Sequence, residues 1–294
     1  MAMTTVMVLV EHTQEGRQAM QAAFLAARRD GGHVVGLYPV PPSERLTPEA
    51  MYFSRASLRM PGEDFSAVLD RTEREGGPGV KAARRTFEEV AANMEATVLE
   101  KPPNPGRLTA YFRALPADGP DEVAAHGRVF DLLVVRQPRV DPGHWVRNML
   151  RALLFRAGRP VLVAPPCDPT SLGQRPLIAW NGSALSARAA AIARNFFDGA
   201  REVGILSVRT KDRSGPSAED LADYIAWHDI EATVIETELA GLRLGDVFLR
   251  EAERFKADLL VMGAYAQSPF RESLTGGVTN HVLSHAELPV LMTH

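Results

Sequence analysis

The chain repeats itself, and this repeat limits its possible folds more than any other feature. The segment Asp131-Leu-Leu-Val-Val135 corresponds to Asp258-Leu-Leu-Val-Met262, and Arg159-Pro-Val-Leu-Val163 corresponds to Leu288-Pro-Val-Leu-Met292. Internal similarity of this kind indicates one structural unit that occurs more than once. We therefore predict that the chain consists of two copies of the same unit.

Within the second copy, short apolar runs alternate with segments of amphipathic helical pattern. Such alternation predicts a parallel sheet with helices on both faces. The predicted fold class is α/β, with two tandem Rossmann-like domains that each contain a five-stranded parallel sheet. The expected strands are 177–180, 203–208, 232–236, 259–262 and 290–292, and the expected helices are 186–197, 218–228, 245–255 and 278–285.

The boundary between the copies is predicted from composition. Residues 165–176 are rich in Pro, Ser and Gly and lack an apolar period, which is typical of a linker. We therefore expect domains at residues 1–166 and 174–294. The first copy is longer, mainly between residues 40 and 98, where 63–75 and 80–94 have helical patterns and 41–61 is either an excursion or a lid. Within 80–94, an apolar stripe at Ala83, Phe87, Val90, Ala91 and Met94 is expected to face the core.

Charge and composition exclude several classes of protein. The formal charge of −3 provides no basic surface for nucleic acid. No apolar run approaches the ~20 residues that a membrane-spanning helix needs, and no signal-peptide pattern is present, so a cytoplasmic location is expected. Cys167 is the only cysteine, which excludes an internal disulfide and a thiolate metal cluster.

The segment from Asp258 to Thr279 has the layout of a phosphate-binding loop. An apolar strand ends at Gly263, and Gly276 and Gly277 come directly before a helical pattern that starts at Val278. Glycine lets the backbone approach an anion closely, and a helix N-terminus favours negative charge. Glycines at such a crossing also occur for turn geometry alone, and both interpretations remain open at this point.

This loop resembles the nucleotide loop of the universal stress protein family. The family pattern is Gly, two residues, Gly, nine residues, Gly and then Ser or Thr. Gly263 and Gly276 match the first and third glycines, whereas Ala266 occupies the second. Gly277 occupies the Ser/Thr position, whose hydroxyl would meet a terminal phosphate.

The resemblance extends to both halves and implies a tandem universal stress protein of the adenine nucleotide alpha hydrolase-like fold. It implies ATP, with Mg²⁺, as the bound cofactor and adenine nucleotide as the ligand. Asn181 stands where ATP-binding relatives have an acidic residue at the end of the first strand. Thr279 and Ser268 could supply a replacement hydroxyl, and Arg271 a cation, although Arg271 is more simply a solvated loop charge. The nucleotide-binding positions expected in this chain are Asn181, Gly182, Ser183, Val208, Met262, Gly263, Ala266, Ser268, Arg271, Gly276, Gly277, Val278 and Thr279.

The first copy lacks the corresponding loop. Arg136-Gln-Pro-Arg139 stands in place of Gly263-Ala-Tyr-Ala266, and Glu11-His-Thr13 in place of Asn181-Gly-Ser183. Arginine and proline would obstruct a close backbone approach to phosphate. We expect the first domain to be a scaffold and pairing partner, with at most one ligand site per chain.

Other polar residues have simpler structural interpretations. His281 and His285 are spaced to chelate a metal on a helix, but no third ligand is evident, so no metal site is expected. Ser183 is more typical of a helix cap than of a nucleophile. Asp118, Asp121 and Glu122 indicate a turn and a helix start. No catalytic residues are predicted.

Three functions remain open. The first is a stress-response binding module with an ATP or adenine-nucleotide site in the second domain only. The second is a scaffold of the same fold that binds no nucleotide, and the third is a slow ATP hydrolase. The terminal strands 161–163 and 290–292 are expected to pair the two domains within one chain, and a homodimer is a further option.

Overall fold

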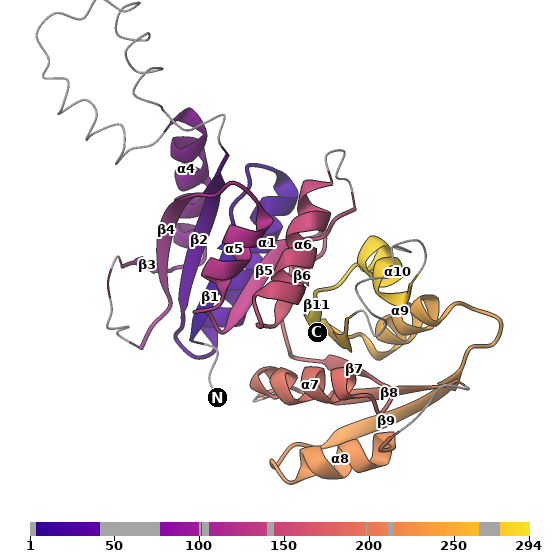
Figure 1. Ribbon diagram of the computed structural model, residues 1–294. Helices are drawn as coiled ribbons and strands as arrows, with labels where there is room; N and C mark the ends of the chain where they lie inside the picture. The colour runs from indigo at the N-terminus through magenta and orange to yellow at the C-terminus, as the bar shows by residue number, and fades with distance from the viewer. Residues whose placement is uncertain are drawn as a thin grey trace, which may run out of the picture.

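The first half of the chain, residues 4–164, alternates strands and helices, and its strands form one part of a long sheet (Figure 1). The structure is a computed structural model, and it describes residues 4–41, 77–99, 101, 106–139, 144–197, 199–210, 215–264 and 277–294. The first half contains β1 (Thr5–Leu9), α1 (Gln14–Arg28), β2 (His33–Val40), α4 (Pro78–Asn93), β3 (Thr97–Val98), β4 (Thr109–Pro116), α5 (Pro120–Gly127), β5 (Leu132–Arg136), α6 (Trp145–Arg156) and β6 (Val161–Ala164).

The second half, residues 176–294, follows the predicted order of elements. Its helix α10 has the predicted bounds, and each of its strands lies within two residues of its predicted ends. The second half contains β7 (Pro176–Trp180), α7 (Ala184–Ala193), a 3-10 turn (Arg194–Phe196), β8 (Val203–Arg209), α8 (Ala218–Ala226), β9 (Ala232–Glu238), α9 (Leu244–Phe255), β10 (Leu259–Gly263), α10 (Val278–His285) and β11 (Val290–Thr293).

All eleven described strands belong to one continuous sheet, in the order β3-β4-β2-β1-β5-β6-β11-β10-β7-β8-β9. The sheet is continuous because β6 and β11 pair antiparallel, with Leu162 opposite Leu291. Every other pairing among the described strands is parallel. The second half contributes five parallel strands, as expected. The first half contributes six, because the two-residue β3 adds to its edge.

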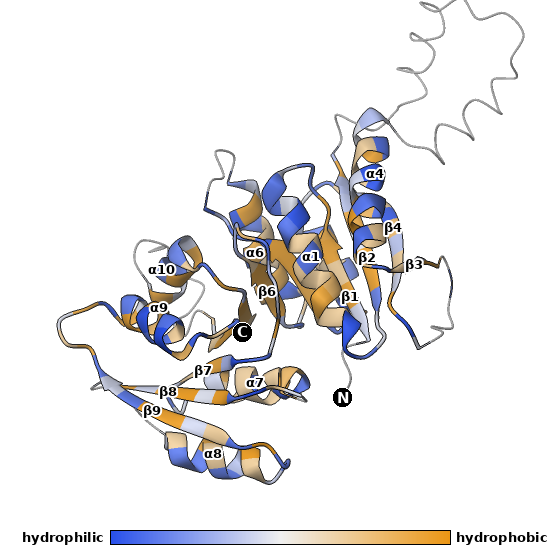
Figure 2. Cartoon of the chain, turned by 180° about the vertical axis from the view of Figure 1, so that it is seen from behind, coloured by the Kyte–Doolittle hydropathy of each residue, from blue (hydrophilic) through white to orange (hydrophobic). Residues whose placement is uncertain are grey.

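Helices cover both faces of this sheet, as the alternation of elements predicted. Neighbouring residues of one strand point to opposite faces. Val6 and Val8 belong to a core cluster that includes residues of α1, α4, α7 and α8, whereas Met7 and Leu9 belong to a second cluster that includes residues of α5, α6, α9 and α10. Hydrophobic residues make up the central strand β6, whereas hydrophilic residues are frequent in α9 (Figure 2).

The repeated Asp-Leu-Leu-Val segment has the same structural role in both halves. The Asp131 carboxylate accepts a hydrogen bond from the backbone N–H of Thr5 at 2.9 Å, at the start of β1. The Asp258 carboxylate accepts from the backbone N–H groups of Gln174 and Arg175, each at 2.8 Å, just before β7. Each aspartate therefore fastens the first strand of its half to the strand that the aspartate precedes.

Helix α4 confirms part of the prediction for the inserted region. Ala83, Phe87, Val90 and Ala91 are buried, whereas Met94 is partly buried against the same core. Gly36 of β2 leaves room for the Phe87 ring, since a Cβ at Gly36 would lie 2.4 Å from it. The predicted helix at 63–75 and the excursion at 41–61 lie outside the described residues, apart from Pro41. Of the helices that the structure describes, none has the length and hydropathy needed to cross a bilayer.

Candidate functional site

The order of strands in the second half creates a switch point between β10 and β7. The chain runs outward from β7 through β8 to β9, then returns to place β10 on the opposite side of β7. Ligands of open α/β sheets bind at the carboxyl ends of strands, where the order reverses. At this point β7 ends at Trp180 and β10 ends at Gly263, and α10 is the helix that follows β10.

The turn after β7 is held by local hydrogen bonds. Asn181 Oδ1 accepts from the Ser183 backbone N–H at 3.1 Å, and Gly182 has φ of +76°, which favours glycine. Ser183 is the N-cap of α7, and its Oγ accepts from the Ser186 N–H at 3.3 Å. The interpretation of Ser183 as a helix cap is therefore confirmed. Trp180 Nε1 donates to the carbonyl oxygen of Pro216, which ties this turn to the segment before α8.

Gly263 has a packing role that the loop pattern did not predict. A Cβ at this position would lie 2.8 Å from Leu185 Cβ and 3.0 Å from the Leu185 carbonyl carbon. The first turn of α7 therefore comes too close to β10 for any larger residue. This close approach explains why glycine occupies position 263, whether or not a ligand binds nearby.

The N-terminus of α10 lies open at the other end of the site. Its N-cap, Gly277, is exposed, has φ of −72° and ψ of 159°, and supplies no side chain to cap the helix. Among the residues that the structure describes, none has an atom within 4 Å of a Cβ placed at Gly277. Behind it, Val278 is partly buried and Thr279 is buried, so the first turn is anchored to the core.

The remaining predicted positions divide into two groups. Val208 and Met262 are buried near the ends of β8 and β10, with exposed fractions of 7% and 4%. The other four predicted positions, Ala266, Ser268, Arg271 and Gly276, lie outside the described residues. Because β7 pairs in parallel with both β8 and β10, the carboxyl ends of these three strands lie side by side.

The two histidines of α10 are engaged in local contacts. His281 Nε2 lies 2.6 Å from Asp246 Oδ1 on α9, and the His281 ring stacks on the His285 ring with centroids 4.3 Å apart. His285 Nδ1 lies 2.9 Å from the carbonyl oxygen of His281. In the part of the chain that the structure describes, no group of three or more His, Cys, Asp or Glu side chains could hold a metal ion.

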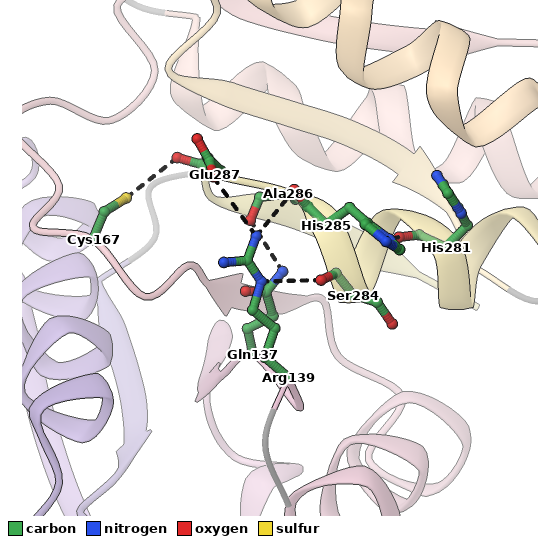
Figure 3. Close-up of polar contacts among 8 residues, drawn as sticks. All are labelled: Gln137, Arg139, Cys167, His281, Ser284, His285, Ala286 and Glu287. Atoms are coloured by element: carbon green, nitrogen blue, oxygen red, sulfur yellow. Dashed lines mark hydrogen bonds and ion pairs between the residues drawn. The ribbon is translucent and has the colours of Figure 1, made fainter.

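The first half holds the C-terminal end of α10, which the sequence analysis missed. Arg139, just after β5, donates from Nε to the Ser284 carbonyl at 3.0 Å and from Nη2 to the His285 carbonyl at 3.2 Å (Figure 3). Gln137 is buried and donates from Nε2 to the Ala286 carbonyl at 3.1 Å. A cation at a helix C-terminus satisfies the last carbonyls and complements the helix dipole. No local sequence signal connects residues so far apart in the chain.

Cys167 lies beside the segment that follows α10. Its Sγ donates to the Glu287 carbonyl oxygen at 3.2 Å (Figure 3). Burial, together with the nearby charges of Glu287 and Asp168, raises the pKa of the Cys167 thiol. A thiol with a raised pKa is a poor nucleophile at neutral pH.

A family comparison matches the part of the chain that contains β10 and α10. The model described as the universal stress protein family matches residues 229–294, which include β9, α9, β10, α10 and β11. The similarity to this family therefore lies in the second half of the chain. No curated protein sequence matches the chain.

Solved universal stress proteins share the fold of the whole chain. A universal stress protein from Archaeoglobus fulgidus aligns over 100% of this chain and 99% of its own, with a TM-score of 0.67 and 13% identity. A putative universal stress protein from Pseudomonas aeruginosa aligns over 99% of this chain and 93% of its own, with a TM-score of 0.54 and 17% identity. Both structures align with nearly the whole chain, so the predicted α/β fold is confirmed.

Proposed function

We propose that this chain is a tandem universal stress protein whose second half alone binds an adenine nucleotide, ATP with Mg²⁺ in particular. One observation carries the proposal: helix α10 is the next described element after β10, at the switch point between β10 and β7. A helix N-terminus at this place favours a phosphate group through its backbone N–H groups and its dipole.

The N-cap residue adds support for a phosphate at α10. Gly277 is exposed and lets an anion approach the first turn without steric hindrance. The missing hydroxyl weakens the site, since a hydrogen bond to a charged group contributes about 1.5–3 kcal/mol. We propose that Ala266, Ser268, Arg271 and Gly276 complete the phosphate end of the site.

The nucleoside would lie at the ends of β7 and β8 in this proposal. Asn181 is exposed and Val208 is buried beside the strand end, so the two could offer a polar and an apolar contact. Gly182 and Ser183 shape the turn that leads from β7 to α7. Met262 and Gly263 provide the end of β10.

A specific observation favours a second function, that of a scaffold which binds no nucleotide. Gly263 is accounted for by its packing against Leu185, and Ser183 by its cap on α7. Under this alternative, the departures Ala266 and Gly277 record a loop that no longer binds phosphate.

We further propose that the two halves act as domains that pair through their terminal strands. The antiparallel register of β6 and β11 supports this pairing, with Val161 opposite Met292 and Val163 opposite Val290. Pairing satisfies the backbone N–H and C=O groups of such apolar edge strands and protects them from pairing with other chains.

Titration calorimetry tests the proposed function. The expected result is saturable binding of ATP at up to millimolar concentration, with weaker binding of AMP because it lacks the terminal phosphates. Absence of saturable ATP binding in this range would favour the scaffold. Phosphate release measured in the same samples with Mg²⁺ would detect slow ATP hydrolysis.

A further inference from the structure

The first half contains a cavity at the carboxyl ends of its own strands, far in sequence from the proposed nucleotide site. The cavity has a volume of about 320 Å³, which is at the lower end of the range for small-molecule pockets. Its lining is mainly apolar and comes from the ends of β1 and β2, the segment after β4 and the start of α6. The lining side chains that matter here are Leu9, Glu11, Tyr38, Pro39, Asp118 and Trp145.

The walls of this cavity are fixed by the sheet. The Val10 N–H donates to the Leu37 carbonyl at 2.9 Å, which continues the pairing of β1 with β2. Gly16 of α1 packs closely against Glu11, since a Cβ at Gly16 would lie 2.6 Å from the Glu11 carbonyl oxygen. A cavity with a rigid frame needs little ordering when a ligand enters, which preserves affinity.

The charge of the lining is negative. Glu11 and Asp118 are carboxylates, and among the described lining residues there is no lysine or arginine. Glu11 accepts a hydrogen bond from Arg136 Nε at 2.6 Å, so the charge of Glu11 is offset in part by this arginine. Next to the cavity, the Asp118 N–H donates to Glu122 Oε2 at 2.8 Å, which adds a further carboxylate to this side of the molecule.

An exposed tryptophan borders the cavity. Trp145, the first residue of α6, is 41% exposed. Tyr38, a second aromatic residue of the lining, has its ring centroid 5.8 Å from that of His12. The preceding residue, His144, has φ of +56°, an uncommon conformation for a residue other than glycine. Aromatic faces attract cations, and tryptophan attracts them most strongly.

We propose that this cavity binds a small organic cation, of the aromatic ammonium or quaternary ammonium class. The apolar walls and the Trp145 ring would contact the body of the ligand, and the carboxylates of Glu11 and Asp118 would favour its charge. The proposal revises the expectation that the first half is only a scaffold. It does not depend on nucleotide binding in the second half.

Ligand-detected NMR on the full chain tests the proposal with phenyltrimethylammonium as the probe and benzenesulfonate as an anion of similar size. We expect saturable binding of phenyltrimethylammonium, and binding of benzenesulfonate that is at least about tenfold weaker, because the carboxylates repel it. Equal binding of both probes, or no saturable binding of the cation at tens of millimolar, would overturn the proposal.

Two substitutions locate the site. Trp145→Ala should weaken phenyltrimethylammonium binding by about two- to fivefold, as expected for a cation–π contact with a partly exposed tryptophan. Trp227→Ala removes a tryptophan that is 87% exposed on the far side of the second half, and it should leave binding unchanged. An unchanged affinity in Trp145→Ala, with a normal thermal unfolding curve, would refute the site.

A charge change gives an independent result. Glu11→Gln removes one of the two carboxylates that line the cavity, so cation binding should fall and benzenesulfonate binding should rise. The ratio of the two affinities is therefore expected to shift by about tenfold or more toward the anion. If the ratio does not change in a folded Glu11→Gln protein, the electrostatic basis of the proposal is wrong.

Discussion

Arg139 of the first half donates a hydrogen bond from Nε to the carbonyl oxygen of Ser284 in the last turn of α10, at 3.0 Å. The N-terminus of the same helix is the end at which we propose that phosphate binds. The first half therefore holds one end of the helix whose other end faces the proposed site. This contact gives the first half a role in the position of α10, even though its own loop does not match the family pattern.

Arg139→Ala should destabilise the contact between the halves. The substitution removes two hydrogen bonds to the end of α10, and because the side chain is 35% exposed we expect a loss of only about 1 kcal/mol in the free energy of unfolding. Urea unfolding followed by circular dichroism measures this loss. The control Arg113→Ala, at an exposed position on β4, should change stability by less than about 0.5 kcal/mol. Equal effects of the two substitutions would contradict the account.

Gly263→Ala should destabilise the protein whatever it binds. The new methyl group would lie 2.8 Å from Leu185 Cβ, so α7 must shift away from β10. Overpacking of this kind usually costs about 1–3 kcal/mol. Thermal unfolding without ligand provides the measurement, and an unchanged midpoint would show that the close approach of α7 is not required.

Gly277→Ser should stabilise α10 slightly. The backbone already has an extended N-cap conformation with open space around it, and serine is a better cap than glycine by a few tenths of a kcal/mol. Gly119→Ser is the matched control, since Gly119 is also an extended N-cap with open space, on α5 of the first half. Both variants should unfold at slightly higher urea concentration, and only Gly277→Ser should also strengthen ATP binding. A drop in stability for Gly277→Ser would mean that the helix start is more crowded than described.

His33 should make the protein less stable below neutral pH. Burial lowers the pKa of His33, whose Nδ1 lies 2.8 Å from Thr109 Oγ1. The folded state therefore binds a proton less readily than the unfolded state, whose histidine has a pKa of about 6.5. Its contribution to stability is present above that value and is lost as the pH falls toward the lower folded pKa. The free energy of unfolding of His33→Gln should accordingly fall less between pH 7 and pH 5 than that of the wild type, as measured by urea unfolding. An identical decline in both proteins would contradict this assignment.

The fold could be predicted largely because its signals are local. The apolar runs that became β7 to β11, and the helical pattern that became α10, depend on spacing within a few residues. The repeat of Asp131 and Asp258 also reflects a real equivalence, since each carboxylate fastens the first strand of its half. The sequence analysis expected the terminal strands 161–163 and 290–292 to pair, but it described two separate five-stranded sheets. The antiparallel pairing of β6 with β11 joins these strands into one sheet.

The site could be predicted only in part. The loop pattern singled out Gly263. The close approach of Leu185 explains why glycine occupies this position, and that approach is visible only in the three-dimensional structure. Arg139 and Gln137 were placed in a segment without ligand-binding features, and their contacts with α10 span more than a hundred residues of sequence. Contacts of this kind depend on how the two halves meet, which no local pattern records.

The central claim is that phosphate binds at the N-terminus of α10, and Gly277→Asp tests it most directly. Aspartate is a good helix cap, so this variant should fold with undiminished stability, yet its charge should repel phosphate. Calorimetric titration with ATP should show binding to the wild type and to Gly119→Asp, and binding at least about tenfold weaker to Gly277→Asp. Equal ATP affinity in all three proteins would contradict the account.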